Sequence, residues 1–405
     1  MSRMQQWIRG GLLFGASAAI LAACNSDTTV IAPTPVNAIF NSYVALGNSI
    51  TAGYQSGGIN DSTQRQSYAV LIAQQMGTRF AYPSLVAPGC PPPIANFQTQ
   101  ARVGGASSTS TSCAFRPNVP VATLNNVAVP GILAADPTAV GGTKGNQGNP
   151  LIDLILGGET MVQKALDAHP TFATVWVGNN DVLAAAISGL PGTATPQASF
   201  VQSYAAMINQ LVAGAPGIKG VLIGVAQVSV VPVLFTGRAL NNIAFLNALS
   251  AAAHKSIGFD PATCTATTNT LIGFPIISAI ASGQHPPFIE CEKTPTPPLG
   301  DVYILDAAEQ VQVAGIVNGY NAYIKAKADS IGFAYYDPNT TFGKIESSDP
   351  ILASRVPNLA SATATFGQYF TLDGIHPSAA AHKLLANDLI TVINAKYGTS
   401  LAPVP

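Results

Sequence analysis

Short apolar runs that alternate with helical patterns constrain the fold of this chain more than any other feature of its sequence. The runs that predict strands cover residues 43–48, 79–86, 124–129, 172–178 and 219–227, with a late one at 333–336. The patterns that predict helices cover residues 66–77, 150–168, 197–213, 239–257, 306–330 and 378–396. Such alternation is typical of a parallel sheet with helices on both faces. We therefore predict an α/β fold, a three-layer α/β/α sandwich around a mainly parallel five-stranded sheet.

The composition limits the partners of this fold. Of the 405 residues, 48% are hydrophobic and only 9% are charged, against roughly 25% charged residues in an average soluble protein. The formal net charge is −1, and so small a field does not attract nucleic acid or an anionic membrane. A surface with so few charges must consist largely of Ser, Thr, Asn, Gln and Gly. We expect an exported protein with no nucleic-acid partner.

The N-terminus has the parts of a secretory signal. Arg3 and Arg9 precede an apolar run at residues 11–20, and the sequence Leu-Ala-Ala-Cys ends at Cys24. This ending resembles a bacterial lipobox, in which the cysteine is lipidated and becomes the first residue of the mature chain. We expect residues 1–23 to be a lipoprotein signal peptide; an ordinary signal peptide is the alternative.

The segment after the lipobox predicts how the folded domain is connected to the membrane anchor. Residues 24–40 are rich in Ser, Thr and Pro, which is typical of a tether. Asn25 follows the cysteine, and this residue favours the outer membrane over the inner one. We therefore expect lipid anchoring to the bacterial cell envelope, with membrane contact only through the N-terminal lipid. The oligomeric state is left open.

Besides the lipobox cysteine, the chain has four cysteines, at Cys90, Cys113, Cys264 and Cys291. An even number in an exported chain indicates disulfides, and four cysteines allow three connectivities. We predict the local pairing, Cys90–Cys113 and Cys264–Cys291, in which each bond contributes roughly 3 kcal/mol in the chain-entropy model. A Cys₄ metal site is the competing interpretation, but no two of these cysteines have Cys-x-x-Cys spacing. We expect no metal.

Two segments interrupt the alternation of strands and helices. Residues 84–120 and residues 258–300 are rich in Pro, Ser, Thr and Gly, and each carries one cysteine pair. We interpret them as disulfide-pinned insertions on a single domain at residues 41–400. Loops at the carboxyl ends of strands gather where ligands bind in open α/β sheets. Residues 258–300 are thus a candidate lining for a substrate pocket, with a surface excursion as the alternative.

Three residues at opposite ends of the domain supply nucleophilic chemistry. Ser49 follows the first predicted strand, on a turn that begins with Gly47, so its hydroxyl lies at the rim of the sheet. Asp373 and His376 stand three residues apart near the C-terminus. The imidazole can take the serine proton, and the carboxylate can orient the imidazole. An α/β-hydrolase instead carries Gly-x-Ser-x-Gly, whose second glycine is missing here.

Two further strand ends supply hydrogen-bond donors. Gly131 follows the strand at residues 124–129, and Asn180 follows the strand at residues 172–178. A tetrahedral intermediate needs donors aimed at its developing oxyanion. The backbone N–H groups of Ser49 and Gly131 and the side-chain amide of Asn180 form such a set.

With these four blocks the chain resembles the GDSL, or SGNH, hydrolases. The residues that give that family its name match Ser49, Gly131, Asn180 and His376, in the same order, within a resemblance that spans about residues 40–397. The family usually has aspartate before the serine, and here the residue is Asn48. This departure changes the local hydrogen bonding of the turn and leaves less negative charge beside the oxyanion site.

The resemblance implies an ester hydrolase of the esterase or lipase type, which forms an acyl-enzyme on Ser49 and needs no cofactor. The expected partner is a small-molecule or lipid ester. The apolar centre of the second insertion favours lipid-like or short-chain acyl esters, and no basic cluster indicates a phosphate headgroup. The alternatives are a carbohydrate O-acetyl esterase of the same fold and a non-catalytic surface lipoprotein that binds glycan or lipid.

Overall fold

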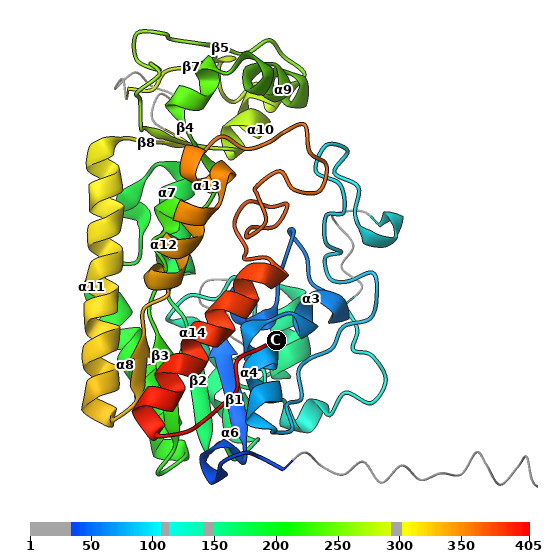
Figure 1. The fold of residues 1–405 in the computed structure, drawn as a ribbon, viewed down its shortest axis with the longest axis vertical. Helices are drawn as coiled ribbons and strands as arrows, with labels where there is room; N and C mark the ends of the chain where they lie inside the picture. The colour runs from blue at the N-terminus through cyan, green and yellow to red at the C-terminus, as the bar shows by residue number, and fades with distance from the viewer. Residues whose placement is uncertain (1–33, 107–112, 141–148, 293–301) are drawn as a thin grey trace, which may run out of the picture. The chain divides into compact units, whose positions relative to one another are not determined.

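A computed structural model describes residues 34–106, 113–140, 149–292 and 302–405 (Figure 1). The predicted signal peptide and the lipidation site Cys24 lie outside the described residues, as do parts of both insertions. Residues 35–405 form one compact unit. Phe40 is fully buried at the end of the short helix η1 (Ala38–Phe40). The folded domain therefore begins before residue 41, inside the predicted tether.

The main sheet contains four parallel strands, β1 (Tyr43–Gly47), β2 (Phe172–Trp176), β3 (Lys219–Ile223) and β9 (Ala334–Tyr336). Their order across the sheet is β1-β2-β3-β9, and each pairs with its neighbour in parallel. Nearly every residue of these strands is buried, because helices cover both faces of the sheet. The parallel arrangement brings the carboxyl ends of all four strands to one edge.

The predicted α/β class is confirmed, but the sheet has four strands where we expected five. Residues 79–86 do not form a strand, because Pro83 interrupts the segment and has no N–H to donate. Residues 124–129 run beside β1, where Ala45 donates to Asn125 and Val127 donates to Ala45 through backbone groups. This segment pairs with β1 through one parallel bridge only and is not a regular strand.

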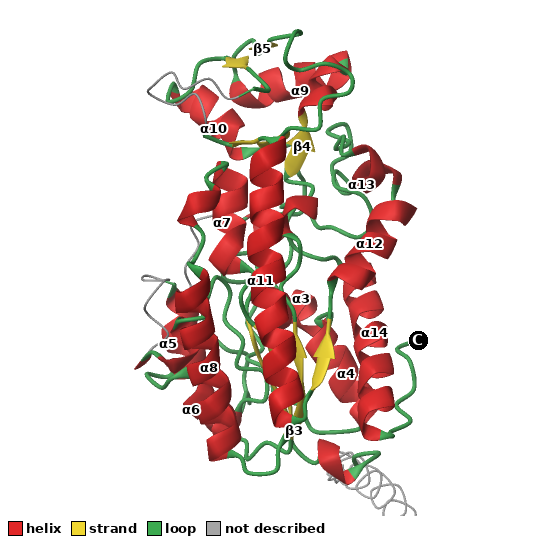
Figure 2. Cartoon of the chain, turned by 90° about the vertical axis from the view of Figure 1, so that its left-hand side faces the viewer, coloured by secondary structure: helices red, strands yellow, loops and turns green. Residues whose placement is uncertain are grey.

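Helices form a layer on each face of the sheet (Figure 2). One layer contains α4 (Tyr68–Met76) and α14 (Ala379–Tyr397), which pack on each other. The other contains α6 (Met161–Leu166), α8 (Gln197–Gly214) and α11 (Ala307–Ile331). Each of the longer helices buries one apolar stripe, such as Val313, Val317, Tyr320 and Ile324 on α11.

The remaining helices of this unit are short. The helix predicted at residues 150–168 is divided by Gly157 and Gly158, both with positive φ. The α-helices are α2 (Ser49–Ala52), α3 (Asp61–Arg65), α5 (Pro150–Leu156), α7 (Asn180–Ser188), α12 (Asn339–Ser348) and α13 (Pro350–Ser354). The 3-10 helices are η2 (Val103–Gly105), η3 (Val121–Thr123), η4 (Asp136–Thr138), η6 (Pro191–Thr193) and η7 (Val228–Val230).

Residues 234–305, which we name the outer subdomain, have a hydrophobic core of their own. Its largest side chains include Phe235, Phe245 and Ile276, all buried. A small antiparallel sheet has the order β4-β6-β8. The elements are β4 (Leu234–Thr236), η8 (Gly237–Asn241), α9 (Ile243–Ala253), β5 (Gly258–Phe259), β6 (Leu271–Gly273), α10 (Pro275–Ser282), β7 (Phe288–Ile289) and β8 (Ile304–Leu305).

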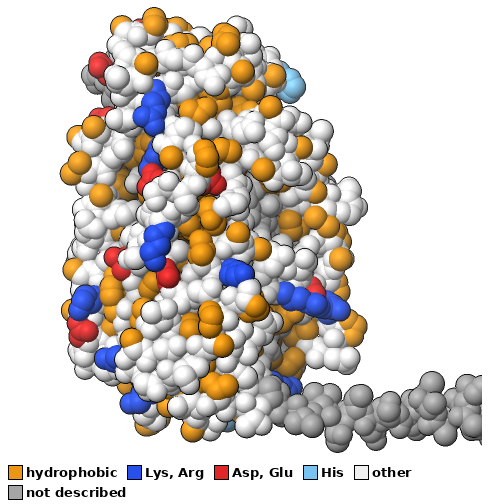
Figure 3. All heavy atoms as spheres, in the orientation of Figure 1, with side chains coloured by type: hydrophobic (Ala, Val, Ile, Leu, Met, Phe, Trp, Pro, Cys, Tyr) orange, Lys and Arg blue, Asp and Glu red, His pale blue; other side chains and the backbone are white. Residues whose placement is uncertain are grey.

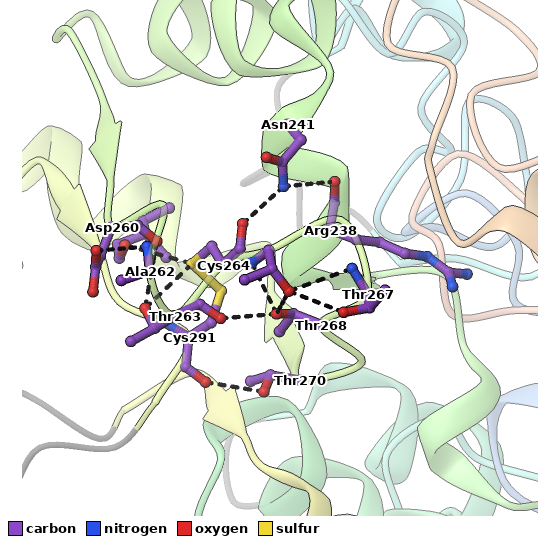
Figure 4. The surroundings of a disulfide bond; sticks show 12 residues. Arg238, Asn241, Asp260, Ala262, Thr263, Cys264, Thr267, Thr268, Thr270 and Cys291 are labelled. Carbon is purple, nitrogen blue, oxygen red and sulfur yellow. Dashed lines mark hydrogen bonds between the residues drawn. A yellow bond between two sulfur atoms is a disulfide. The ribbon is translucent and has the colours of Figure 1, made fainter.

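The disulfide Cys264–Cys291 is present in the outer subdomain and joins two of its loops (Figure 4). Polar side chains hold both halves of this junction. Asn241 donates to the carbonyl of Cys264 at 2.8 Å, and the hydroxyl of Thr270 donates to the carbonyl of Cys291 at 2.9 Å. The disulfide is thus part of a hydrogen-bonded seam on one side of the small core.

The disulfide Cys90–Cys113 is present in the first insertion. This region packs on the main core, to which it contributes Leu85 and Cys90. Charges are sparse on the face shown in Figure 3, where blue and red side chains are scattered among white and orange atoms. Within the described part of the chain, no helix is both long and apolar enough to cross a membrane.

Candidate active site

Ser49 lies at the carboxyl edge of the sheet, where β1 passes into α2. Asn48 caps this helix, because its Oδ1 accepts a hydrogen bond from the Ile50 N–H at 3.1 Å. Gly47 is required by close approach, since a Cβ there would lie 2.1 Å from Thr51 Oγ1. Ser49 is 8% exposed. Its hydroxyl is thus held in a fixed, largely desolvated place.

His376 reaches Ser49 from the other end of the chain. Its Nε2 lies 2.9 Å from Ser49 Oγ, and its Nδ1 lies 2.8 Å from Asp373 Oδ2. An Nδ1–H that donates to the carboxylate leaves Nε2 free to accept the serine proton. The turn that carries the ring is closed by the Thr371 N–H, which donates to the carbonyl of His376 at 2.9 Å.

The Asp373 carboxylate accepts hydrogen bonds on both oxygens. Besides the imidazole, Oδ2 accepts from the backbone N–H of Gly57 at 2.6 Å. Oδ1 accepts from the N–H groups of Ile375 and His376, both at 2.9 Å, and from Thr371 Oγ1 at 3.1 Å. Burial alone would raise the pKa of Asp373, but His376 and these hydrogen bonds lower it to about 2. The group is therefore an anion at neutral pH.

Tyr54 covers one side of the imidazole. The ring centroids of Tyr54 and His376 are 4.9 Å apart, with the planes tilted by 53°. Burial, reinforced by the charge of Asp373, raises the pKa of Tyr54 to about 12. The phenol is therefore neutral at any physiological pH and confines the imidazole without competing for its proton.

Gly131 and Asn180 line the same cleft as Ser49 and His376, and this cleft has a volume of about 410 Å³. Asn180 begins α7, and its Nδ2 donates one hydrogen bond to the carbonyl of Ile132 at 2.8 Å. Among the described residues the second N–H of that amide has no acceptor, so it can donate to another group. Gly131 has a φ of +84°, a conformation that favours glycine. All five residues predicted for catalysis thus meet at one edge of the sheet.

Several residues at the site carry no signal in the sequence. The N–H of Gly57 and the ring of Tyr54 reach the triad only because the chain after α2 turns back toward the C-terminal loop. Asp181, in the first turn of α7, accepts a hydrogen bond from the Ala134 N–H at 2.9 Å. It therefore holds the loop that carries Gly131. Only the side chains of residue types suited to nucleophilic and proton-transfer chemistry were recognisable from the sequence.

The described part of the second insertion, residues 258–292, does not line the cleft. None of its described residues lines either of the two cavities that adjoin Ser49. Its apolar centre instead contributes Leu271, Ile272 and Ile276 to buried cores. The first insertion does reach the cleft, through Cys90 and Pro91. Among the residues that the structure describes, no group of three or more His, Cys, Asp or Glu side chains is placed to hold a metal ion.

A serine hydroxyl, an imidazole and a buried carboxylate in series, on a parallel sheet, define a hydrolase of the serine type. The sequence match is more specific. Residues 43–389 match the model of the GDSL-like lipase/acylhydrolase family, and the chain belongs to that family. The protein is therefore an ester hydrolase.

Comparison with curated proteins gives no match. Solved structures with a similar course of the chain include a catalytic mutant of an acetylxylan esterase from Geobacillus stearothermophilus, with 10% identity, 89% of this chain and 96% of that chain covered, and a TM-score of 0.37. They also include an extracellular lipase from Streptomyces rimosus, which is 13% identical in sequence. That match covers 87% of this chain and 99% of the lipase, with a TM-score of 0.33. The family assignment rests on the sequence match.

Proposed function

We propose that the protein hydrolyses carboxylic esters through an acyl-enzyme on Ser49. Ser49 Oγ attacks the ester carbonyl while its proton passes to His376 Nε2, and the imidazolium then protonates the departing alcohol as the ester C–O bond breaks. Water attacks the acyl-enzyme by the same route and releases the acid. Asp373 holds the tautomer and stabilises the imidazolium. The observation that carries the proposal is the continuous contact from Ser49 Oγ through the ring to Asp373.

The proposed oxyanion donors are the N–H groups of Ser49 and Gly131 and the side-chain amide of Asn180. The common cleft supports this set, and so does the anchoring of Asn180 by its bond to Ile132. Donors of this kind act in a largely desolvated site, where loss of one typically lowers kcat by about 10²–10³.

A neutral ester with a short acyl group is the substrate class that the cavities favour. The cleft has a volume of about 410 Å³, while a second cavity beside Ser49 is less open and has a volume of about 30 Å³. Their described linings contain no Lys, Arg, Asp or Glu, so nothing there pairs with a charged headgroup. A larger alcohol fits the open cleft, and a sugar is one such alcohol. Carbohydrate O-acetyl esters therefore remain the second candidate.

Export and anchoring are proposed from the N-terminal sequence alone. Cys24 follows the pattern of a lipobox, and the exported chain would then be tied to the cell envelope, with the outer membrane favoured by Asn25. Metabolic labelling with a palmitate analogue should mark the wild-type chain and not Cys24→Ala. Labelling that persists in the variant would contradict lipidation at this cysteine.

A fluorophosphonate probe tests the nucleophile. The wild-type protein should be labelled and lose its activity on ethyl butanoate, whereas Ser49→Ala should be neither labelled nor active. Ser347→Ala, a change at an exposed serine, is the matched control and should behave as wild type. Labelling of a folded Ser49→Ala protein would contradict the assignment, and an inert wild-type protein would favour the non-catalytic surface lipoprotein.

A further inference from the structure

The segment that leads to Gly131 runs beside β1 and is held to it by backbone hydrogen bonds. Val127 donates to the carbonyl of Ala45 at 3.0 Å, and Val129 donates to the carbonyl of Gly47 at 3.1 Å. Gly47 is the last residue of β1, after which the chain leaves the sheet and enters α2. These bonds therefore fix the segment against the strand, up to the point where the helix of the nucleophile begins.

The side chain of Asn126 continues the connection beyond the strand. Asn126 is 1% exposed, and its Nδ2 donates to the carbonyl of Thr51, in α2, at 2.9 Å. Its Oδ1 accepts from the Ala128 N–H at 3.1 Å, within its own segment. The amide can be placed in one orientation only, because Nδ2 donates and Oδ1 accepts. Asn126 thus ties the helix of Ser49 to the segment that ends at Gly131.

These two segments supply the backbone donors proposed for the oxyanion. Ser49 and Thr51 lie in the same short helix, and Gly131 closes the segment that begins with Asn126. The distance between the two donors therefore depends on how α2 is held against that segment. A donor stabilises the tetrahedral intermediate only when it lies about 2.7–3.1 Å from the oxyanion.

We propose that Asn126 is a positioning residue, which sets the spacing between the N–H groups of Ser49 and Gly131. Asn126 lines neither of the two cavities that adjoin Ser49, so it acts through the Thr51 carbonyl and through the turn at Ala128. This inference rests on the proposed function, since it concerns the oxyanion donors of the same reaction.

Asn126→Ser tests the inference with little change to the surrounding core. The serine hydroxyl can still accept from the Ala128 N–H, as hydroxyls do in turns, but the side chain is too short to reach the Thr51 carbonyl. That carbonyl keeps a partner, because Ser67 Oγ also donates to it at 2.8 Å. The variant should therefore fold. If it does not, Asn126→Thr carries the same test, because its extra methyl group fills more of the space.

The preceding residue gives a matched control. Asn125 is 8% exposed, and its Nδ2 donates to the carbonyl of Tyr43 at 2.9 Å. Its Oδ1 accepts from the Ala81 N–H at 2.9 Å. Tyr43 is the first residue of β1, at the other end of the strand from α2. Asn125→Ser therefore removes the same kind of bridge from a similarly buried amide, away from the oxyanion site.

Two measurements on the full chain separate the transition state from substrate binding. Hydrolysis of ethyl butanoate gives kcat and KM. Inhibition by propane-1-boronic acid reports on the oxyanion site, because Ser49 Oγ adds to the boron while its proton passes to His376 Nε2. The product is a tetrahedral boronate anion that has no leaving group, and one of its oxygens occupies the place of the oxyanion.

We expect Asn126→Ser to lower kcat about tenfold and to raise the inhibition constant of the boronic acid about tenfold, because a displaced donor binds the tetrahedral state less well. Its KM should stay within about twofold of the wild type, since the lost interaction belongs to the transition state. Asn125→Ser should keep all three wild-type values, although denaturant unfolding should show a loss of stability in both variants.

A wild-type kcat in folded Asn126→Ser would overturn the inference. An equal loss of kcat in Asn125→Ser would overturn it too, because the effect would then come from general loosening of the segment. A lower kcat with an unchanged inhibition constant would place the defect away from the oxyanion and would also overturn it. A wild-type protein that neither hydrolyses ethyl butanoate nor binds the boronic acid would instead refute the proposed function, and the inference with it.

Discussion

The two disulfide-pinned regions of this protein differ in what they stabilise. The first, residues 84–120, lies against the turn after α2, where Ile94 donates to the carbonyl of Ser56 at 2.7 Å. Arg102 Nη1 donates to the carbonyl of Gly57 at 2.9 Å, and the Gly57 N–H in turn donates to Asp373. This region therefore supports the Asp373 carboxylate through one intermediate residue.

The outer subdomain supports chiefly itself. It has a second core of its own, and only its small sheet also contributes to the main core, through Leu234, Leu271 and Leu305. A backbone hydrogen bond links its entry point to the loop that carries Asp373 and His376. The N–H of Val233, the residue before β4, donates to the carbonyl of Gly374 at 2.8 Å. The comparison shows that a disulfide in a loop indicates that the segment is constrained. It does not indicate which part of the protein the segment stabilises. One bond here holds a support of the active site, and the other holds a small core.

The largest effect is expected from a cavity in the outer subdomain. Phe235 is fully buried, with Phe245 and Phe274 each at a ring distance of 5.2 Å. Phe235→Ala should destabilise this core by about 3–5 kcal/mol. Hydrogen exchange should then quicken in α9 and α10 but not in β1 and β2, and ester hydrolysis should persist at low temperature.

Phe40→Ala in the main core is the control for that variant and should quicken exchange in β1 and β2. If Phe235→Ala loosened the main sheet equally, the two cores would unfold as one unit, and the contrast between the regions would fail.

Removal of each disulfide sharpens the contrast. Cys90→Ser/Cys113→Ser and Cys264→Ser/Cys291→Ser should each cost roughly 3 kcal/mol of stability in the chain-entropy model. Only the first pair should also lower kcat/KM, by about tenfold, because Cys90 lines the cleft and its region supports Asp373. The melting temperatures and kcat/KM values of the two variants test this prediction. Equal losses of kcat/KM would show that the two disulfides do not differ in their effect on the active site.

Asp181, which holds the loop that carries Gly131, belongs to neither of these two regions. It should make the stability of the protein depend on pH. Burial raises the pKa of Asp181 from 3.8 to about 6, against the hydrogen bond from Ala134. The folded state therefore holds a proton that the unfolded state releases, and stability should fall as pH rises from about 4 to 6, by up to roughly 3 kcal/mol. Asp181→Asn should lack this fall.

Denaturant unfolding of the wild type and Asp181→Asn between pH 4 and 7 measures that effect. The two proteins should be similar in stability at pH 4, and the variant should be the more stable one at pH 7. Parallel curves across this range would show that Asp181 does not titrate there.

The smallest effect is expected from the outermost link of the first region. Arg102→Leu removes the donors to the carbonyls of Gly57 and Pro92, so the Gly57 N–H should hold Asp373 less firmly. We expect kcat to fall about tenfold, which is about 1.4 kcal/mol in activation free energy, with partial recovery in Arg102→Lys. The control is Arg79→Leu, a change at an exposed arginine, and its kcat should equal that of the wild type. A wild-type kcat in Arg102→Leu would show that the hydrogen bond from Arg102 to Gly57 does not support Asp373.

The sequence predicted the parts of the fold that local pattern determines. The helices expected at residues 197–213, 306–330 and 378–396 correspond to α8, α11 and α14 within a residue or two. Long amphipathic helices are predictable from the sequence, because one stripe of apolar residues repeats with the helical period. The short helices α10 and α12 were missed, since two or three turns carry too few repeats.

The candidate site was predictable only in its chemistry. Ser49 and His376 were found because few residue types perform nucleophilic and proton-transfer steps and both follow predictable turns. The Gly57 N–H, the Tyr54 ring and the Arg102 guanidinium were not found, because their roles depend on approaches between distant segments that residue type does not encode. Asn48 was noticed as a departure from the family, but only the structure shows that its buried Nδ2 has no hydrogen-bond partner among the described residues.

The small antiparallel sheet has a practical consequence. The chain enters the outer subdomain at β4 and leaves it at β8, and both strands flank β6. Two strand spacings separate them, roughly 10 Å, so a linker of a few residues can span the gap. Protein engineers can therefore exchange the intervening segment for another binding element without rerouting the hydrolase scaffold, provided that the replacement also covers the main core where Leu271 now packs.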